Sequence, residues 1–251
     1  MSEAVTTRFE GEVAWVTLRR PERRNALDAA SAAAVARAVE EAGGRARAIV
    51  LHGAGGAFCA GGDLDELRSW AGRSHDEIAS TLYGSFQAMI RAVRGTDAVV
   101  VAAITGPAVG AGMDLALACD LRVAGRGARL GQVWVRLGVI PGTGGAFLTQ
   151  ALTGPGRAAE LLLTGDLIDA EAALAAGLVN AVVEDDRVLE EADALTRRIL
   201  RHPAAGVAAN KRAYVAATDE AVEAALRHAA RVQPERFTSD EFRAAVERVR
   251  R

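Results

Sequence analysis

Short apolar runs alternate with helical patterns through most of the chain. The runs lie at residues 13–18, 47–51 and 98–104. They are rich in β-branched and aliphatic residues and are closed by proline or glycine, so they predict strands. Between the first two, residues 28–41 are rich in alanine, with Asp28 in the N-cap position and Gly43-Gly44 at the end. This pattern predicts a helix between two strands.

The same alternation continues beyond Asp120. A strand is predicted up to Val123, followed by helices near residues 145–152 and 157–163. Asp169 is placed to cap a short helix that Gly177 ends, and a strand is predicted over 178–183. From residue 186 only helical spacing remains, which predicts an α/β core at 1–184 and a C-terminal helical segment at 185–251.

Composition excludes several function classes. The net charge is −2 with acids and bases interspersed, which does not favour binding to nucleic acid. Lys211 is the only lysine, and no phosphate-binding loop of the G-x-x-x-x-G-K-[ST] type occurs. The uncharged stretch 98–113 is shorter than the roughly 20 residues of a membrane span. Cys59 and Cys119 lack metal-ligand spacing and favour a reducing compartment, so a cytoplasmic protein without a membrane anchor is predicted.

Two glycine-dense loops, at residues 53–64 and 106–115, each follow a buried strand and open a helix. Glycine permits positive φ angles and close approach of the backbone to a ligand, and a helix N-terminus favours negative charge. Two such loops can each supply one N–H to an oxyanion or thioester enolate. Neither loop fits the dinucleotide fingerprint G-x-G-x-x-G.

The motifs in these loops are specific. They read Phe-x-Ala-Gly-x-Asp-Leu over 58–64 and Gly-x-Gly-x-Asp-Leu-Ala-x-Ala-Cys-Asp over 110–120. With further marks at 20–27, 137–145, 163–165 and 172–179, the chain resembles the enoyl-CoA hydratase/isomerase (crotonase) superfamily over nearly its whole length. The resemblance implies a spiral of ββα units, acyl-CoA thioester substrates, no separate cofactor or metal, and a C-terminal segment supporting a homotrimer or dimer of trimers.

The resemblance also assigns roles to individual residues. It places the oxyanion donors at Gly62 and Ala111, where alanine is a mild departure because the family usually has glycine at the second position. The expected substrate-binding residues are Arg24, Ala26, Ala60, Gly61, Asp63, Leu64, Gly110, Trp134 and Gly142. For Arg24 and its neighbour Arg23, a phosphate contact and a solvated surface charge are equally open.

The acid/base pair departs from that of the family's hydratases, which use two glutamates. Their positions hold Asp114 and Trp134. Asp114 remains a carboxylate, and in an apolar cavity its pKa would rise and suit proton transfer; the alternative is an acid that complements the helix dipole. Trp134 can pack against a flat acyl group and donate one hydrogen bond, or it is a core residue.

The superfamily's aryl-CoA dehalogenases resemble this chain at Trp134, but their nucleophilic aspartate would fall on Gly142. This argues against dehalogenation and against isomerases with an acid there. A second acid remains possible at Asp65, Glu66 or His75. The sequence therefore predicts a cofactor-independent hydratase/isomerase-type enzyme. A thioester hydrolase or decarboxylase, and an acyl-CoA-binding protein without catalysis, are the alternatives.

Overall fold

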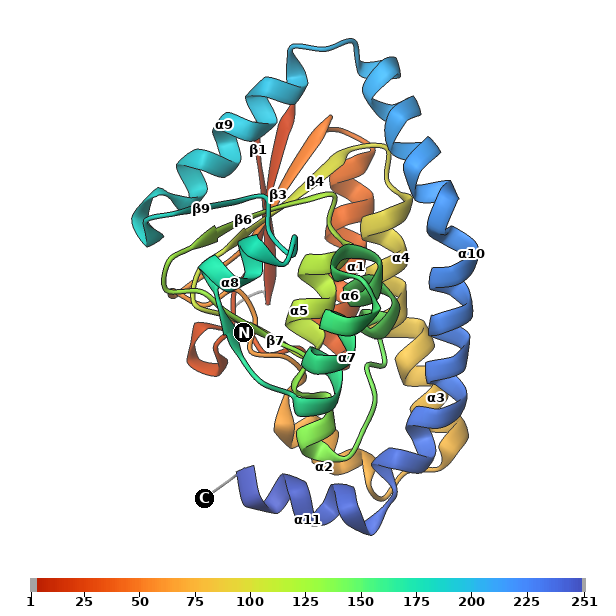
Figure 1. The fold of residues 1–251 in the computed structure, drawn as a ribbon. Helices are drawn as coiled ribbons and strands as arrows, with labels where there is room; N and C mark the ends of the chain where they lie inside the picture. Colours follow the sequence, from red (N-terminus) through yellow and green to blue (C-terminus); the bar gives the residue numbers. More distant parts are fainter. Residues whose placement is uncertain (1–3, 250–251) are drawn as a thin grey trace.

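The computed structural model describes residues 4–249, and its centre is a six-stranded sheet in the order β1-β2-β3-β4-β6-β9 (Figure 1). β1 and β2 form an antiparallel hairpin, and the later strands are parallel to their neighbours. The strands are β1 (Val5–Glu10), β2 (Val13–Leu18), β3 (Ala48–Gly53), β4 (Val99–Ile104), β6 (Leu121–Gly125) and β9 (Ala181–Val183).

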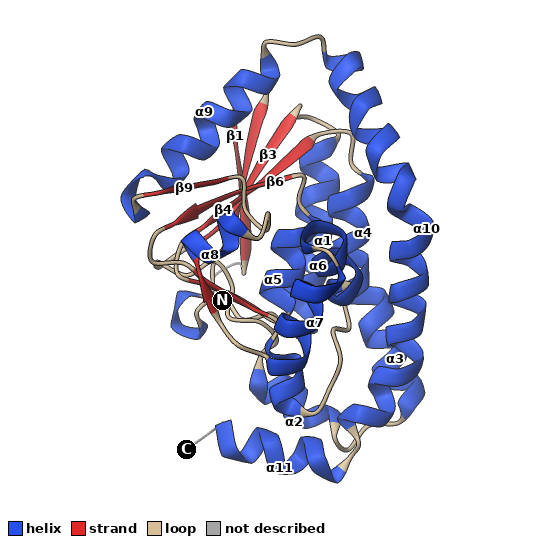
Figure 2. Ribbon diagram, in the orientation of Figure 1, coloured by secondary structure: helices blue, strands red, loops and turns tan. Residues whose placement is uncertain are grey.

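Helices cover both faces of this sheet (Figure 2). α1 (Ala29–Gly43) and α4 (Ala88–Gly95) pack together on one face, and α9 (Val188–Leu200) packs on the other. Alternate residues of β4 therefore belong to two different cores: Val100, Ala102 and Ile104 face α1 and α4, while Val99, Val101 and Ala103 face α9. Burial on both faces explains why this strand reads as a continuous apolar run.

A second, three-stranded sheet holds the two Gly-rich loops. It consists of β5 (Pro107–Val109), β7 (Arg129–Gly131) and β8 (Ile168–Asp169). Two single-residue bridges join the first loop to its surroundings, one between Cys59 and Ala108 and one between Leu27 and Gly62. Both loops therefore belong to one hydrogen-bonded layer.

The remaining helices surround this layer and run down one side of the molecule. They are α2 (Leu64–Trp70), α3 (His75–Thr81), α5 (Ala111–Ala118), α6 (Gly145–Thr153), α7 (Pro155–Thr164), α8 (Ala170–Ala175), α10 (Ala204–Phe237) and α11 (Asp240–Val249). A π-helix at Leu82–Gln87 joins α3 to α4, and 3₁₀ turns lie at Pro21–Arg23, Val133–Leu137 and Asp185–Arg187. Edge-to-face contacts among Trp70, Phe86, Phe237 and Phe242 fasten α10 and α11 to α2 and the π-helix. The C-terminal helices thus share their core with the rest of the chain.

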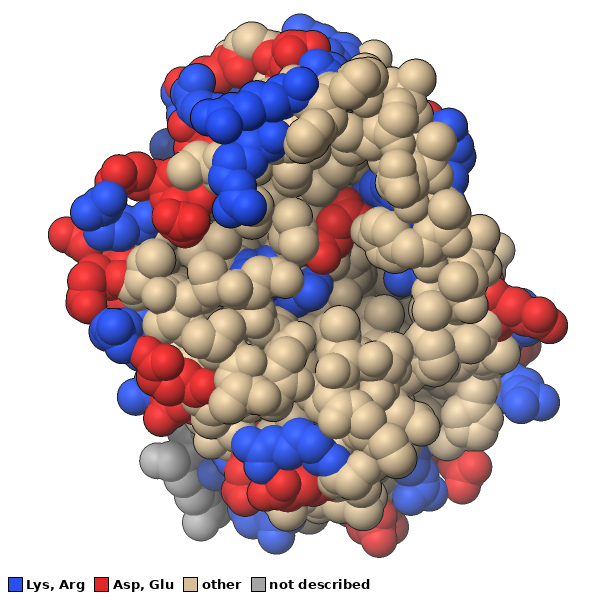
Figure 3. All heavy atoms as spheres, turned by 45° about the horizontal axis from the view of Figure 1, so that its top comes forward, with Lys and Arg blue, Asp and Glu red and all other residues tan. Residues whose placement is uncertain are grey.

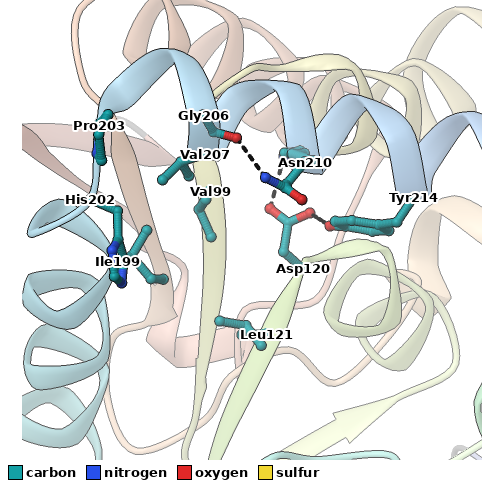
Figure 4. Close-up of a pocket in the computed structure, with 11 residues that line it drawn as sticks. Val99, Asp120, Leu121, Ile199, His202, Pro203, Gly206, Val207, Asn210 and Tyr214 are labelled. Carbon is teal, nitrogen blue, oxygen red and sulfur yellow. Dashed lines mark hydrogen bonds and ion pairs between the residues drawn. The ribbon is translucent and has the colours of Figure 1, made fainter.

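A buried ion pair ties α10 to the sheet. Lys211 Nζ donates to Asp120 Oδ2 at 2.8 Å and to the Ala98 carbonyl at 2.8 Å, and Tyr214 donates to the other oxygen of Asp120. Asp120 and Tyr214, both labelled in Figure 4, line an apolar cavity of about 510 Å³ together with Val99 and residues of α9 and α10. None of the Gly-rich loop residues lines this cavity.

Most of the predicted elements are confirmed. The three apolar runs are strands β2, β3 and β4, and Asp28 caps α1 by accepting a hydrogen bond from the Ser31 N–H. The prediction of a strand over 178–183 is wrong at its start, because β9 begins at Ala181. Leu178 and Val179 are apolar because they are buried in the core, and the Leu178 carbonyl accepts from Arg122 Nε rather than from a strand.

The surface carries both signs of charge. On the face in Figure 3, acidic and basic side chains are interspersed along the edges, and the centre is mostly uncharged. Among residues 4–249, no helix is long and apolar enough to cross a membrane.

Candidate active site

The two Gly-rich loops lie against each other. The Cys59 N–H donates to the Pro107 carbonyl at 2.9 Å, and the Val109 N–H donates to the Cys59 carbonyl at 3.1 Å. A Cβ on Gly112 would lie only 2.3 Å from the Cys59 oxygen, and a Cβ on Gly61 would lie 2.9 Å from the Val109 oxygen. Gly61 also has a φ of +97°. Glycine is therefore required where the two backbones approach most closely.

Gly62 and Ala111 each present a backbone N–H at this contact. Ala111 is the first residue of α5, so its N–H has no acceptor within the helix. Both neighbours of Gly62 are hydrogen-bonded to Leu27. The Leu27 N–H donates to the Gly61 carbonyl, and the Asp63 N–H donates to the Leu27 carbonyl. Within residues 4–249 neither N–H donates to an acceptor. A Cβ built on Gly61 would lie 3.8 Å from the Ala111 nitrogen, which places the two donors in one small region.

Asp114 lies in the first turn of α5 and is fully buried. Its Oδ1 accepts a hydrogen bond from Gln132 Nε2 at 2.8 Å, and its Oδ2 accepts one from Thr143 Oγ1. Gly145, at the start of α6, must be glycine, because a Cβ there would lie 1.8 Å from Asp114 Oδ1. The carboxylate is thus held in one position by the residues that precede α6.

Burial raises the pKa of Asp114 to about 6. The hydrogen bonds from Thr143 and Gln132, together with the Trp134 N–H and the Gly145 backbone, oppose this rise because they stabilise the charged form. None of the largest influences on the pKa of Asp114 comes from a cationic side chain among the described residues. A carboxyl group with a pKa near neutral can both take and give a proton under ordinary conditions.

Trp134 lies in the 3₁₀ turn and is 7% exposed. A Cβ on Gly110 would lie 3.6 Å from its Cε2 atom, so the indole borders the second loop beside Ala111. Its N–H lowers the pKa of Asp114 through proximity, yet it makes no well-formed hydrogen bond within residues 4–249. The structure therefore brings together Ala111, Asp114 and Trp134, as the sequence predicted.

The predicted CoA-binding residues follow the first loop. The Ala60 N–H donates to the Arg24 carbonyl at 3.0 Å, which places residues 24–26 beside residues 60–64. Arg24 is exposed and Arg23 forms an ion pair with Asp65. Asp63 caps α2, and its carboxylate accepts a hydrogen bond from Arg20 Nη2 at 3.0 Å.

Other predicted candidates lie in separate surroundings. Asp65 pairs with arginines on the surface, Glu66 accepts from the Ala29 N–H, and the ring of His75 contacts Thr238. None of these three side chains shares a hydrogen bond with Asp114. Gly142 packs against Leu82 and Gln233. A Cβ added at Gly142 would lie 3.3 Å from an atom of each of these side chains. Among the described residues, no three His, Cys, Asp or Glu side chains gather as metal ligands.

Two residues of the site were missed from the sequence. Gln132 and Thr143 hold the two oxygens of Asp114, although they are 18 and 29 positions away in the chain. Thr143 lies inside the motif at 137–145, and Gln132 lies two positions before Trp134. Their contact with Asp114 depends on how α5 and α6 pack, which no local pattern reveals.

Comparison with known proteins identifies the family of the chain. The family model for enoyl-CoA hydratase/isomerase matches residues 8–250. A probable enoyl-CoA hydratase of Rhodobacter capsulatus is 35% identical over 235 residues, which cover 94% of this chain and 90% of that protein.

Solved structures give the same result. An enoyl-CoA hydratase/isomerase from Mycobacterium paratuberculosis has a TM-score of 0.92 and 30% identity over 99% of each chain. An enoyl-CoA hydratase from Bacillus halodurans has a TM-score of 0.91 and 25% identity, covering 98% of this chain and all of that one. The chain therefore has the crotonase-like fold and belongs to the enoyl-CoA hydratase/isomerase family of enzymes.

Proposed function

We propose that the chain moves a proton along the acyl group of a CoA thioester. The N–H groups of Gly62 and Ala111 bind the thioester carbonyl oxygen and stabilise the enolate that forms when Asp114 removes a proton from the α-carbon. Asp114 then returns the proton to a carbon further along the conjugated system. The observation that carries this proposal is the buried Asp114, with its pKa of about 6, held beside two unpaired N–H donors.

A single carboxylate supports proton relocation better than addition of water. Hydration requires one group to activate the water and another to protonate the α-carbon. Asp114 is the one acid held at the predicted catalytic pair, because Trp134 occupies the other position and an indole does not exchange protons near neutral pH. In an isomerisation the same carboxyl group removes and returns the proton, so no second acid and no co-reactant are needed.

The test is Asp114→Asn, assayed on unsaturated acyl-CoA thioesters with product analysis. Loss of the base should lower kcat by roughly 10²- to 10⁴-fold, the usual contribution of general acid–base catalysis. Asp166→Asn, an exposed aspartate on the surface, is the matched control and should keep full activity. Turnover of the Asp114 variant within a few-fold of the wild type would contradict the proposal. Free CoA or released CO₂ as product would instead indicate a hydrolase or a decarboxylase.

We also propose the wider setting of this activity. CoA enters as part of the substrate, with no further cofactor, and the protein works in the cytoplasm. The helical segment from residue 185 supports a homotrimer or a dimer of trimers. Light scattering on the purified chain would test the assembly, and a monomer at micromolar concentration would contradict it.

A further inference from the structure

The loop at residues 139–144, between the 3₁₀ turn at Val133–Leu137 and α6, carries one of the groups that hold Asp114. Thr143 in this loop is buried, and its hydroxyl donates to Asp114 Oδ2. The loop itself contains no helix or strand. Its backbone must therefore be fixed by contacts with other elements if Thr143 is to stay in place.

Gln233 of α10 binds both backbone groups of Ile140. Its Oε1 accepts from the Ile140 N–H at 3.0 Å, and its Nε2 donates to the Ile140 carbonyl at 2.6 Å. The Gln233 side chain is fully buried. Within residues 4–249 the Ile140 backbone makes no other hydrogen bond. A glutamine suits this contact because its amide carries an acceptor and a donor side by side.

Gln87, the last residue of the π-helix, holds the same loop two residues further on. Its Nε2 donates to the Gly142 carbonyl at 3.1 Å and to the Leu226 carbonyl at 2.9 Å. Leu226 precedes Gln233 by about two turns of α10, so both contacts involve one face of that helix. Gln87 is also fully buried. Two buried glutamines thus connect the loop to the π-helix and to α10.

Close packing leaves the loop little room to move between these contacts. A Cβ added at Gly142 would lie 3.3 Å from Gln233 Nε2 and 3.3 Å from Leu82 Cδ2. Pro141, directly before Gly142, has a φ angle that is fixed by its ring. Thr143 follows at once, so a shift of this backbone would move its hydroxyl away from the carboxylate.

The groups with the largest influence on the Asp114 carboxylate, apart from burial, are uncharged. They are the hydrogen-bond donors of Thr143, Gln132, Trp134 and the Gly145 backbone, and each lowers the pKa of Asp114. On α4, which packs against α5, Arg91 is paired with Glu223 of α10. His228 is exposed and is the one titratable side chain among the residues that line a cavity of about 320 Å³ beside the 3₁₀ turn. None of these charged groups replaces the hydrogen bond from Thr143.

We propose that Gln233 is a positioning residue for Asp114. By binding both backbone groups of Ile140, it holds the loop where the Thr143 hydroxyl donates to the carboxylate. Gln87 supports the same loop from the π-helix. The catalytic consequence rests on the proposed function, in which Asp114 takes up the proton, whereas the hydrogen bond itself does not.

The test follows the titration of Asp114 directly, so that it does not depend on turnover. In protein labelled with carbon-13 at the aspartate side-chain carboxyl, NMR would record the Asp114 signal, identified by its absence in Asp114→Asn. Gln233→Met keeps the length of the side chain without its polar groups. It should raise the pKa of Asp114 by up to roughly one unit, the value of a lost hydrogen bond to a charged group. The pH profile of kcat/KM should shift in the same direction.

A double variant decides whether Gln233 acts through Thr143. Thr143→Val removes the hydrogen bond itself and should raise the pKa of Asp114 at least as much as Gln233→Met does. Adding Gln233→Met to Thr143→Val should then raise the pKa no further, because both changes remove the same bond. Gln87→Met should give a smaller rise, and it takes the place of Gln233→Met in the test if that variant does not fold.

Two controls separate positioning from stability. Gln150→Met replaces an exposed glutamine of α6, and Val35→Ala leaves a cavity in the core beside α1. Neither should move the titration of Asp114, although the second variant loses stability. An unchanged pKa in Gln233→Met, or in Gln87→Met used in its place, would overturn the inference, as would additive shifts in the double variant. If Gln233→Met moves the titration while Asp114→Asn keeps its turnover, the inference stands and the proposed function falls.

Discussion

The oxygen-binding half and the proton-handling half of the candidate site are built differently. In the first, Gly62 and Ala111 act through backbone N–H groups, and their positions depend on two loops approaching within contact distance. In the second, Asp114 acts through a side chain whose position depends on Gln132 and Thr143 from other elements. Oxyanion binding by the first half should therefore survive changes of side-chain chemistry but be lost when the two loop backbones separate. Proton transfer by the second half should change when a single hydrogen bond to Asp114 is removed.

Within the oxygen-binding half, the largest effect is predicted for Gly112→Ala. The added methyl would lie 2.3 Å from the Cys59 carbonyl oxygen, which belongs to backbone and cannot rotate away. The loops must separate, so we expect a loss in kcat of roughly 10²- to 10³-fold, as for removal of one oxyanion donor. Steady-state kinetics on folded protein, verified by circular dichroism, would measure it.

The matched control for this prediction is Gly156→Ala in α7, where an added Cβ meets no atom within 4 Å. This variant should keep wild-type activity and gain slightly in stability through its helix propensity. A Gly112→Ala enzyme as active as the Gly156→Ala enzyme would show that close approach of the loops is not needed.

The second prediction concerns the stability of Asp114→Asn, the variant that is expected to lose activity. Its free energy of unfolding is expected to rise although its kcat falls. Because the folded pKa of Asp114 is about 6 and its ordinary pKa is 3.8, the ionised carboxylate destabilises the native state. Below about pH 4 the residue is protonated in both states, and the wild type loses stability as the pH rises through 6. The neutral asparagine avoids this loss, so above pH 6 the variant should be more stable by on the order of 2–3 kcal/mol.

Urea unfolding of both proteins at pH 4 and pH 8 would measure this difference. The asparagine can still accept from Gln132, and its amide can donate to Thr143, so its packing should be retained. A variant less stable than the wild type at pH 8 would mean that the hydrogen bonds of the carboxylate outweigh the cost of burying its charge.

The contrast between the two halves also explains what the sequence could predict. The oxygen-binding half was readable because glycine runs between a strand and a helix are local patterns with one physical cause. The network around Asp114 was not, since Gln132 and Thr143 reach it only after α5 and α6 have packed. The same limit applies to Leu178, because an apolar residue buried in the core and one paired in a strand look alike in the sequence.

The third prediction isolates one hydrogen bond of the proton-handling half. Thr143 donates to Asp114 and lowers its pKa, so Thr143→Val should raise that pKa by roughly one unit above 6. If Asp114 acts as a base, kcat/KM rises with pH through this pKa, and the variant's profile should shift to higher pH. The loss would be about fivefold at pH 6, would approach about tenfold below pH 5, and would be small at pH 8. Thr164→Val, on the surface of α7, should leave the profile unchanged.

The smallest effect is predicted outside both halves, at Arg24. Its guanidinium is exposed and free of any ion pair within residues 4–249, whereas the neighbouring Arg23 is engaged with Asp65. A contact between Arg24 and a CoA phosphate would be solvent-exposed, so Arg24→Ala should raise KM only about two- to fivefold. Salt should diminish the difference, because exposed charges are screened.

Thioesters that lack the phosphates separate this contact from a general loss of structure. With an acyl-pantetheine substrate, Arg24→Ala and the wild type should have the same KM, and kcat should be equal on both substrates. Arg23→Ala is the comparison variant, since its guanidinium already has a partner, and it should change KM less than Arg24→Ala does. A lower kcat for Arg24→Ala on acyl-pantetheine would mean that residues 24–26 influence the oxygen-binding half through Ala60, whose N–H donates to the Arg24 carbonyl.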